Sequence, residues 1–306
     1  MRYAMPEPVV HQGSMPATGA ATAAGTGGAT QAPIPRTLWT YWNQPEPDGF
    51  VRRCLQSWEQ HCPDYVIRLV HPGNLAEFVA PGDLPETFAG LHPTKQADWL
   101  RLYLVHRFGG YWLDATVLLT RAPDWLDAQR LQHRAGFAGF YLGGFTRDAH
   151  FPVVESWAFG APAGESFMQA WQREFHDALI VQGTETYLVR LRQQPDGGAA
   201  VLQGIADPAY LLIHVAAQQV LRRPNGFRLV LLKAEDTAYY YQQTLGWKWY
   251  LLYPRLCLVP DVATPAPLIK LRGGERRHFT QMIAQHGEPV SGSLWHRACA
   301  QASTGQ

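Results

Sequence analysis

The chain has 306 residues, of which 46% are hydrophobic and 17% are charged. This apolar content is sufficient for a folded core, and it excludes a wholly disordered chain, a coiled coil and a collagen-like chain. The 26 Lys and Arg residues against 25 Asp and Glu residues leave a net charge of +1. Such a balance provides no field that would attract nucleic acid or an anionic membrane surface.

The cysteines and the apolar runs bear on where the protein works. None of the four cysteines forms a Cys-x-x-Cys pair, so neither a zinc ribbon nor a disulfide framework is expected. No apolar stretch has the length of a signal-peptide core at the N-terminus or of a membrane span. We therefore expect a soluble, cytoplasmic protein with no transmembrane segment.

The N-terminal region differs in composition from the rest of the chain. Glycine, alanine and threonine occupy 16 of the 20 positions from Gly13 to Ala32. Such a segment has almost no apolar side chains to bury, and we predict that residues 1–32 form a disordered tail. No proline- or glycine-rich linker divides the remainder, so residues 33–306 are predicted to form one domain.

The first elements of that domain are predicted to be a strand, a helix and a second strand. Residues 36–42 are rich in aromatic and β-branched side chains and are followed by Asn43-Gln44-Pro45, which is typical of a buried strand. Apolar residues recur at helical spacing over 50–58, and residues 65–70 have the composition of a second strand. This order indicates an α/β fold with a mainly parallel sheet, in which ligands bind beyond the carboxyl ends of the strands.

A helix is predicted from Pro93 to Phe108, with apolar residues on nearly all of its faces. Asp98 and Arg101 interrupt this apolar surface, and their spacing makes them neighbours on the helix. A buried charge is costly unless it is paired or bound to a ligand. The two residues are therefore candidate site residues, and an ordinary salt bridge within the helix is the alternative.

A short strand ending at an acidic residue is predicted directly after this helix. Gly109-Gly110 supply the turn, residues 111–113 form the strand, and Asp114 follows where the strand ends. Side chains alternate along an extended segment, so Asp114 and Thr116 face the same side. A carboxylate and a hydroxyl are oxygen ligands suited to Mg²⁺ or Mn²⁺. The alternative is that Asp114 only begins a turn.

Several stretches together resemble the capsular polysaccharide synthesis proteins, relatives of glycosyltransferases whose sugar-binding region contains an Asp-x-Asp (DXD) motif. The most specific are Ile34–Trp42, Ala97–Arg101 and Phe108–Thr116, with further similarity at Glu155–Trp157, Gly160–Pro162, Tyr210–His214 and Ile269–Leu271. The resemblance extends from about residue 34 to residue 272. It implies a single α/β domain of GT-A type that transfers sugars from nucleotide diphosphates.

The resemblance also implies roles for particular residues on the donor side. Trp42 would stack on the nucleobase, with Thr40 and Tyr41 beside it. Asp98 and Arg101 would contact the donor sugar and the diphosphate and belong, with Asp114, to the catalytic group.

The resemblance further implies a divalent metal, Mn²⁺ or Mg²⁺, at the DXD position. This sequence reads Asp114-Ala115-Thr116 there, so the second carboxylate is missing and the predicted metal ligands are Asp114 and Thr116. Lys270 would add positive charge at the phosphates, with a surface lysine as the alternative. Glu155 would lie on the acceptor side, with a structural hydrogen bond as the alternative.

Three residues in the C-terminal half of the chain have weaker indications of a role in binding. His214 lies in an apolar helical pattern, and we predict a core histidine rather than a ligand. Trp295 is predicted to pack in the core, although Ser293 and Trp295 loosely resemble donor-lid residues of some relatives.

Together these features lead us to expect a glycosyltransferase of hexosyltransferase type. It would move a sugar from a nucleotide donor, with a UDP-sugar expected, to a polysaccharide or other glycan in bacterial capsule or surface polysaccharide biosynthesis, with retention of anomeric configuration. A lipid-linked acceptor would bring the protein to the inner face of the membrane. The alternative is a non-catalytic protein that binds nucleotide sugars or glycans; the net charge disfavours a nucleic-acid-binding protein.

Overall fold

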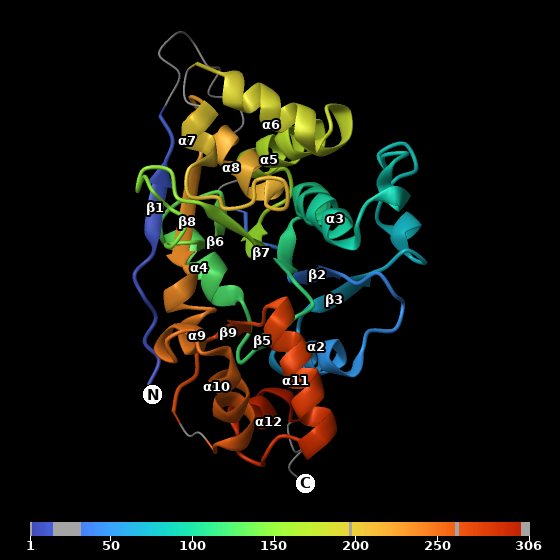
Figure 1. Cartoon of the computed structure of the whole chain (residues 1–306), viewed down its shortest axis with the longest axis vertical. Helices are drawn as coiled ribbons and strands as arrows, with labels where there is room; N and C mark the ends of the chain where they lie inside the picture. Colours follow the sequence, from blue (N-terminus) through green and yellow to red (C-terminus); the bar gives the residue numbers. More distant parts are fainter. Residues whose placement is uncertain (1, 15–31, 196–197, 261–262, 301–306) are drawn as a thin grey trace.

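The structure is a computed structural model, and it describes residues 2–14, 32–195, 198–260 and 263–300. A seven-stranded sheet runs through the molecule (Figure 1). From one edge to the other, its strands are β1 (Val9–Gln12), β8 (Arg228–Lys233), β6 (Phe137–Tyr141), β7 (Val154–Ala161), β4 (Gly110–Leu113), β2 (Thr37–Tyr41) and β3 (Val66–Val70).

The direction of the strands agrees with the prediction of an α/β fold with a mainly parallel sheet. Parallel pairing joins β2 to β3, β2 to β4 and β6 to β8. Antiparallel pairing joins β7 to both β4 and β6, and β1 to β8. Five of these seven strands therefore point the same way, and only β7 and β1 run in the opposite direction.

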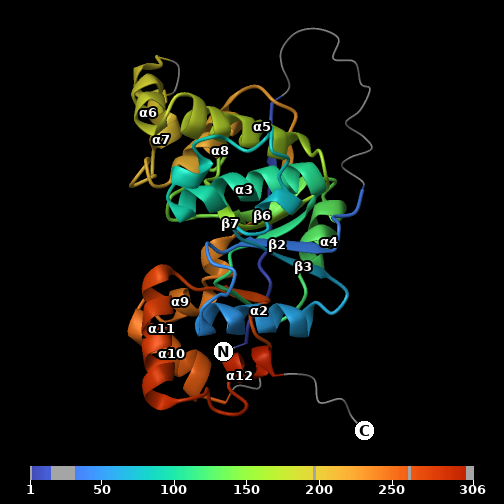
Figure 2. The ribbon, with the colours of Figure 1, turned by 90° about the vertical axis from the view of Figure 1, so that its right-hand side faces the viewer.

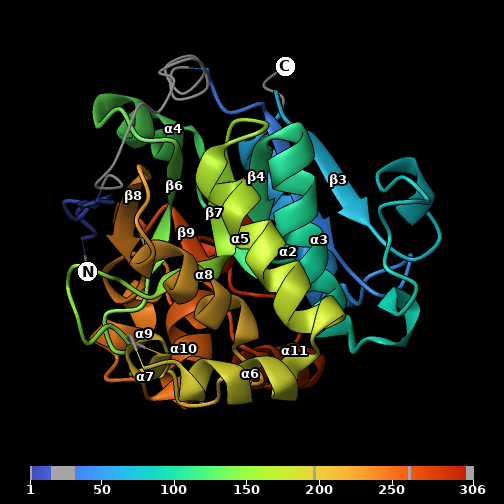
Figure 3. The same cartoon turned by 90° about the horizontal axis from the view of Figure 1, so that it is seen from above.

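Helices cover both faces of the sheet. The helices of the described residues are α2 (Gly49–His61), α3 (Pro93–Phe108), α4 (Asp124–Gln132), α5 (Ser166–His176), α6 (Thr184–Gln193), α7 (Gly198–Leu202), α8 (Leu212–Arg222), α9 (Tyr240–Thr244), α10 (Trp249–Tyr253), α11 (Gly273–His286) and α12 (Leu294–Cys299). Figure 2 shows α3 and α5 on one face of the sheet and α2 on the other, and Figure 3 shows α3 beside α5. None of the helices in these described ranges is both long enough and apolar enough to cross a membrane.

Short helical turns and a second sheet complete the described structure. The turns are η1 (Leu75–Glu77), η2 (Phe88–Gly90), η3 (Asp177–Val181), η4 (Ala234–Asp236) and η5 (Pro254–Leu258), and the second sheet pairs β5 (Val117–Leu119) with β9 (Leu268–Lys270). The α9 to α12 helices lie with this small sheet at one end of the molecule (Figure 1).

The α3 helix carries two of the predicted site residues, and local sequence explains its limits. Pro93 occupies its first turn, where the missing N–H costs nothing. Its last residue is followed by Gly109, which has φ of +67°. A Cβ at Gly109 would lie 2.6 Å from the Ala163 nitrogen, so both conformation and space require glycine there. Every residue from Trp99 to Val105 is buried, which confirms that the helix is enclosed on nearly all sides.

The predicted strand–helix–strand opening is also confirmed by β2, α2 and β3. The side chain of Asp48 caps α2 by accepting from the Val51 N–H at 2.9 Å, a common arrangement at helix starts. Trp58 on α2 is fully buried, and its indole N–H donates to the Val117 carbonyl at 2.8 Å. This bond ties the helix to the strand that follows Asp114.

The prediction of a disordered tail over residues 1–32 is wrong for residues 2–14. Val9–Gln12 form β1, which pairs with β8 in a register that places Val10 opposite Val230. The β-branched valines suit a strand, and β1 covers backbone groups of β8 that would otherwise form an open sheet edge. Tyr3 is buried and packs edge-on against Tyr240. Residue 1 and residues 15–31 lie outside the described residues.

Candidate functional site

A cavity of about 1260 Å³ lies beyond the carboxyl ends of β2, β4, β6 and β8. Its lining includes a residue at or just after the end of each of these strands, namely Tyr41, Asp114, Leu142 and Lys233. This is the edge of the sheet at which ligand binding is expected in an α/β fold. The volume exceeds the range of about 300–1,000 Å³ typical of small-molecule sites, so it can accommodate a ligand of nucleotide-sugar size.

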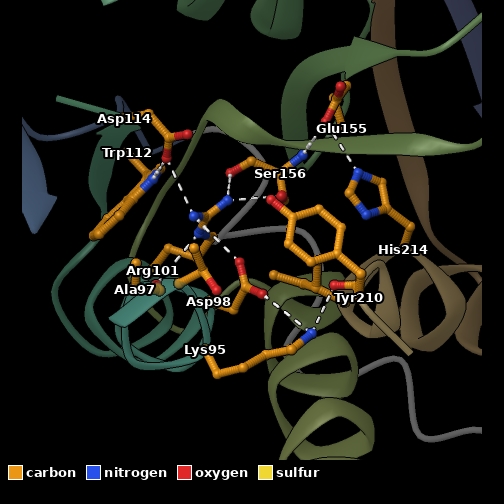
Figure 4. Close-up of polar contacts among 12 residues, drawn as sticks. Lys95, Ala97, Asp98, Arg101, Trp112, Asp114, Glu155, Ser156, Tyr210 and His214 are labelled. Carbon is orange, nitrogen blue, oxygen red and sulfur yellow. Dashed lines mark hydrogen bonds and ion pairs between the residues drawn. The ribbon is translucent and has the colours of Figure 1, made fainter. Parts of the chain in front are cut away.

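Four charged side chains form a connected cluster in the wall of this cavity. Arg101 reaches from α3 to two carboxylates: its Nη2 lies 3.2 Å from Asp98 Oδ1 and 3.2 Å from Asp114 Oδ1 (Figure 4). On the far side of Asp114, Oδ2 accepts a hydrogen bond from Lys270 Nζ at 2.7 Å. The structure therefore brings together residues from α3, the end of β4 and β9.

Arg101 is held rigidly in this cluster. Its side chain is 7% exposed, and its Nη1 donates to the Ser156 carbonyl at 2.8 Å and to the Ser156 hydroxyl at 2.7 Å. Its Nε donates to the Ala97 carbonyl at 3.3 Å, and the guanidinium lies over the Trp112 ring. With its donors occupied by protein groups, Arg101 positions Asp98 and Asp114. Its predicted direct contact with the donor stays a prediction.

The two carboxylates of the cluster differ in their electrostatic environment. Burial raises the pKa of Asp98, although Arg101 and Lys95 oppose this effect. Burial also acts to raise the pKa of Asp114, but the positive charges of Lys270 and Arg101 outweigh it and lower the pKa. The cations beside Asp114 therefore favour its ionised form, whereas burial works against the charge on Asp98.

Lys270 is placed here by the second sheet. The β5 strand begins just after Thr116 and pairs with β9 so that Val117 lies opposite Lys270. Lys270 is 8% exposed, which excludes the alternative of an ordinary surface lysine. Its ammonium lies 3.1 Å from the Thr116 hydroxyl as well as 2.7 Å from Asp114.

The residues predicted to bind a metal are therefore both bonded to a side-chain cation. A divalent cation is held by several oxygen ligands whose combined charge is negative. Here Asp114 is the only carboxylate of the predicted pair, and it already contacts Lys270 and Arg101. No group of three or more His, Cys, Asp or Glu side chains within the described ranges is arranged to hold a metal ion. As arranged, Asp114 and Thr116 do not fit a divalent metal.

Glu155 and His214 form a second polar pair in the cavity wall. Glu155, on β7, accepts a hydrogen bond from the Ser156 N–H at 3.0 Å, and its Oε2 lies 3.0 Å from His214 Nε2 (Figure 4). Both side chains are buried, and both line the cavity. Glu155 thus makes a structural hydrogen bond and also borders the cavity. His214 is buried as predicted, but it lies at the cavity rather than away from it.

The residues predicted to surround the nucleobase are only partly brought to the cavity. Tyr41 and Trp42 line it, and the Tyr41 hydroxyl donates to Gln96 Oε1 at 2.6 Å. Thr40 is fully buried within β2 and is not among the lining residues. Side chains alternate along the strand, so Thr40 and Tyr41 point to opposite faces, and the structure does not bring Thr40 to the site.

The sequence patterns did not single out Arg272, Arg276 or Trp247, which also line the cavity. Arg272 and Arg276, at the start of α11, line the cavity. The Arg276 guanidinium lies 5.3 Å from the Trp42 ring centroid, and that of Arg272 lies 5.0 Å from the Trp247 ring centroid. The available signal was the run Lys-Leu-Arg-Gly-Gly before a helical pattern, because helix starts attract anions.

Glu235 is a further cavity residue that the sequence did not indicate. Its two carboxylate oxygens accept from the N–H groups of Gly143 and Gly144 at 3.0 and 2.8 Å. These two hydrogen bonds from successive amides to one side chain shape the loop after β6, and that loop forms part of the cavity wall.

Ser293 and Trp295, which loosely resemble donor-lid residues of some relatives, do not line this cavity. Trp295 is fully buried in the core with Phe279, as predicted. Ser293 caps α12, where its hydroxyl accepts from the His296 N–H.

Comparison with known proteins relates just under half of the chain to a family. Residues 29–177 match the family model of capsular polysaccharide synthesis proteins. This region is thus similar to the family that the sequence resembles, and it contains Asp98, Arg101, Asp114, Thr116 and Glu155 but not Lys270. No curated protein matches the chain.

One solved structure similar to this chain is described as a PaToxG glycosyltransferase. The two share 12% sequence identity, and the alignment covers 63% of this chain and 80% of that one, with a TM-score of 0.35.

Proposed function

We propose that this protein is a glycosyltransferase that moves a sugar from a nucleoside diphosphate donor to a glycan acceptor in capsule or surface polysaccharide synthesis. One observation carries the proposal. A cavity large enough for a nucleotide sugar lies at the carboxyl edge of the sheet, and its wall contains the cluster of Asp98, Arg101, Asp114 and Lys270. Three of these four residues lie in the region similar to capsular polysaccharide synthesis proteins. We further propose that residues 33–306, together with the N-terminal strand β1, form a single domain of GT-A type.

The charged and aromatic side chains of the cavity suit different parts of a nucleotide-sugar donor. The diphosphate would lie against Lys270, Arg276 and the start of α11, which together offer two side-chain cations and a helix N-terminus. The base would stack near Trp42. We propose uridine as the base and a hexose as the transferred sugar.

The proposed reaction is a transfer with retention at the anomeric carbon. The bond between that carbon and the β-phosphate oxygen breaks, and its electron pair stays on the diphosphate. The acceptor hydroxyl oxygen forms the new bond on the same face, and its proton passes to the departing phosphate oxygen. Positive charge grows on the sugar during this step, while negative charge grows on the diphosphate, where fixed cations stabilise it.

Glu155 would serve the acceptor side in this arrangement. Its carboxylate borders the cavity, and the contacts to the Ser156 N–H and His214 fix its position. A carboxylate held in this way can accept a hydrogen bond from a sugar hydroxyl and so orient the acceptor.

A screen of sugar nucleotides for hydrolysis tests the proposal. UDP-, GDP- and dTDP-sugars would be incubated with the full chain, and release of the nucleoside diphosphate would be measured. We expect release from at least one UDP-hexose, with further stimulation by an acceptor glycan. If none of these donors is hydrolysed and none binds, the proposed function is refuted.

A non-catalytic binder of nucleotide sugars is the second candidate. The observation that favours it is the contact of Lys270 with both Asp114 and Thr116, since these residues are the ones that would hold a catalytic metal in a DXD enzyme. Calorimetric titration of UDP combined with the hydrolysis screen separates the two candidates. Binding of UDP without sugar release from any donor would support the binder.

A further inference from the structure

We infer that the Lys270 ammonium stands in the place of the divalent metal in this site, so that donor binding and transfer require no metal ion. The inference rests on the proposed function, because it concerns the same donor site. It departs from what the resemblance to DXD enzymes implies, and it follows from the contacts of four side chains.

The oxygen atoms that a metal would need already have partners in the protein. Asp114 Oδ2 accepts from Lys270 Nζ at 2.7 Å, and the Thr116 hydroxyl lies 3.1 Å from the same nitrogen. The other oxygen of Asp114, Oδ1, contacts Arg101 Nη2 at 3.2 Å and accepts from the Trp112 indole N–H at 3.0 Å. Both carboxylate oxygens are therefore occupied, and a metal ion at ~2.1 Å from them would have to displace Lys270.

The charged side chains around Asp114 also disfavour a metal ion. Two carboxylates, Asp98 and Asp114, face three cations, namely Arg101, Lys270 and Lys95, which lies 3.8 Å from Asp98. This group has no excess of negative charge to offset a divalent cation. Calcium and magnesium sites gain their affinity from the number of charged oxygen ligands, so the cluster disfavours a metal on charge as well as on geometry.

The backbone of Lys270 is held on both sides by hydrogen bonds. Its backbone N–H donates to the Ala238 carbonyl at 3.1 Å, and its carbonyl accepts from Gln242 Nε2 at 2.7 Å. The neighbouring Ile269 and Leu271 are buried in the core. With its backbone fixed on both sides and its side chain 11% exposed, the ammonium keeps its position before a donor arrives. A charge fixed in advance stabilises a developing negative charge without reorganisation.

Lys270 also has an N–H group left for a hydrogen bond to a ligand. An ammonium has three N–H donors, and among the described residues Nζ donates to Asp114 and Thr116 only. The remaining N–H is available to a phosphate oxygen in the cavity that Lys270 lines. As the sugar–phosphate bond breaks, its electron pair moves onto the diphosphate, and the Lys270 ammonium stabilises that charge by a hydrogen bond.

The experiment compares metal-free and metal-loaded conditions in the full chain. UDP would be titrated by calorimetry, and hydrolysis of the preferred donor measured, first in EDTA and then in Mn²⁺. For the wild type we expect affinity and rate to agree within about twofold between the two conditions. A wild type that binds or turns over only when Mn²⁺ is present would overturn the inference.

Lys270→Met supplies the second arm, because methionine keeps an unbranched apolar stem and lacks the terminal ammonium. In EDTA we expect a loss of about 10²–10³ in rate, the range for removal of one oxyanion-stabilising donor, and at least a tenfold loss of UDP affinity. Addition of Mn²⁺ should restore part of the affinity, because Asp114 and Thr116 are then free to bind it. A purely structural lysine would show no such rescue.

Two further variants keep this arm interpretable. Lys248→Ala removes an exposed lysine that does not line the cavity, and it should match the wild type in every assay. Lys270→Arg retains the charge and should keep more UDP affinity than Lys270→Met in EDTA. If Lys270→Met behaves like the wild type, or if the loss does not depend on charge, the inference is overturned.

The outcomes also separate this inference from the proposed function. Donor hydrolysis that requires Mn²⁺ would preserve the proposed function and refute the role of Lys270. Metal-independent UDP binding that is lost in Lys270→Met, without hydrolysis of any donor, would preserve the inference on binding and refute the enzyme. A wild type that binds no nucleoside diphosphate in either condition would refute both.

Discussion

Replacing Arg101 with methionine should destabilise the fold by about 3 kcal/mol. Arg101 is almost fully buried and contacts Asp98, Asp114 and Ser156. Removing one partner of a buried ion pair typically costs about 3–5 kcal/mol, because the other charge is left uncompensated. The lower end applies here, since Asp114 retains Lys270 and Asp98 retains Lys95.

Thermal unfolding followed by circular dichroism measures this effect. For a chain of 306 residues, the entropy of unfolding is about 0.6 kcal/mol/K, so a loss of about 3 kcal/mol lowers Tm by about 5 °C. The matched control is Arg107→Met, which removes an exposed arginine from the same helix and should change stability by less than about 0.5 kcal/mol.

A double-mutant cycle attributes the loss to the ion pair. Asp98→Asn removes the charge that Arg101 compensates, so the double variant should lose less than the sum of the two single variants by about 0.5–3 kcal/mol. If Arg101→Met melts within about 1 °C of the wild type, or if the two substitutions are strictly additive, the reasoning from buried charge is wrong.

Asp114→Asn should lower donor hydrolysis by at least ~100-fold while a cooperative melt is retained, because the positions of Lys270 and Arg101 depend on this carboxylate; a rate within threefold of the wild type would contradict this. Folding lowers the pKa of Asp114 below its ordinary value of 3.8, so the ionised carboxylate stabilises the fold at pH values above 3.8. This stabilisation is lost as the pH falls through the folded-state pKa. In urea titrations the stability difference between wild type and Asp114→Asn should therefore shrink below pH 3.8, and a constant difference would refute the assignment. Gly109→Ala should cost about 1–3 kcal/mol, since alanine disfavours the positive φ and its Cβ would clash with the Ala163 nitrogen; Gly273→Ala, at a glycine whose Cβ would meet nothing, is the control in thermal melts.

Local sequence patterns were sufficient for the elements that carry most of the site. The aromatic run before Asn43 predicts β2, and the enclosed helix followed by Gly109-Gly110 predicts α3 and its end. Two charges within an otherwise apolar helix must be compensated when the helix is buried, which is why Asp98 and Arg101 could be identified as candidate residues. Asp114 and Thr116 do contact the same ammonium, but the alternation of an extended strand is not the reason, because Asp114 begins a turn in which the Val117 N–H donates to the Asp114 carbonyl at 2.9 Å.

Other features depend on contacts between distant parts of the chain. The composition of residues 1–32 suggested a tail, but whether Val9–Gln12 become ordered depends on the open edge of β8, more than 200 residues further on. The family resemblance also implied Thr40 among the donor-binding residues, and only the packing of β2 shows that its side chain is buried away from the cavity.

The sequence by itself determined β2, α2, β3, α3 and β4 and which buried charges need partners, because these properties depend on residues a few positions apart. Tertiary structure decided what those partners are. The pairing of β5 with β9 brings Lys270 to Asp114 across 156 positions of sequence, and our inference of a side-chain cation in place of a metal rests on this contact. Packing of whole elements creates the contact, since neither local propensity nor spacing specifies which strand lies beside the end of β4.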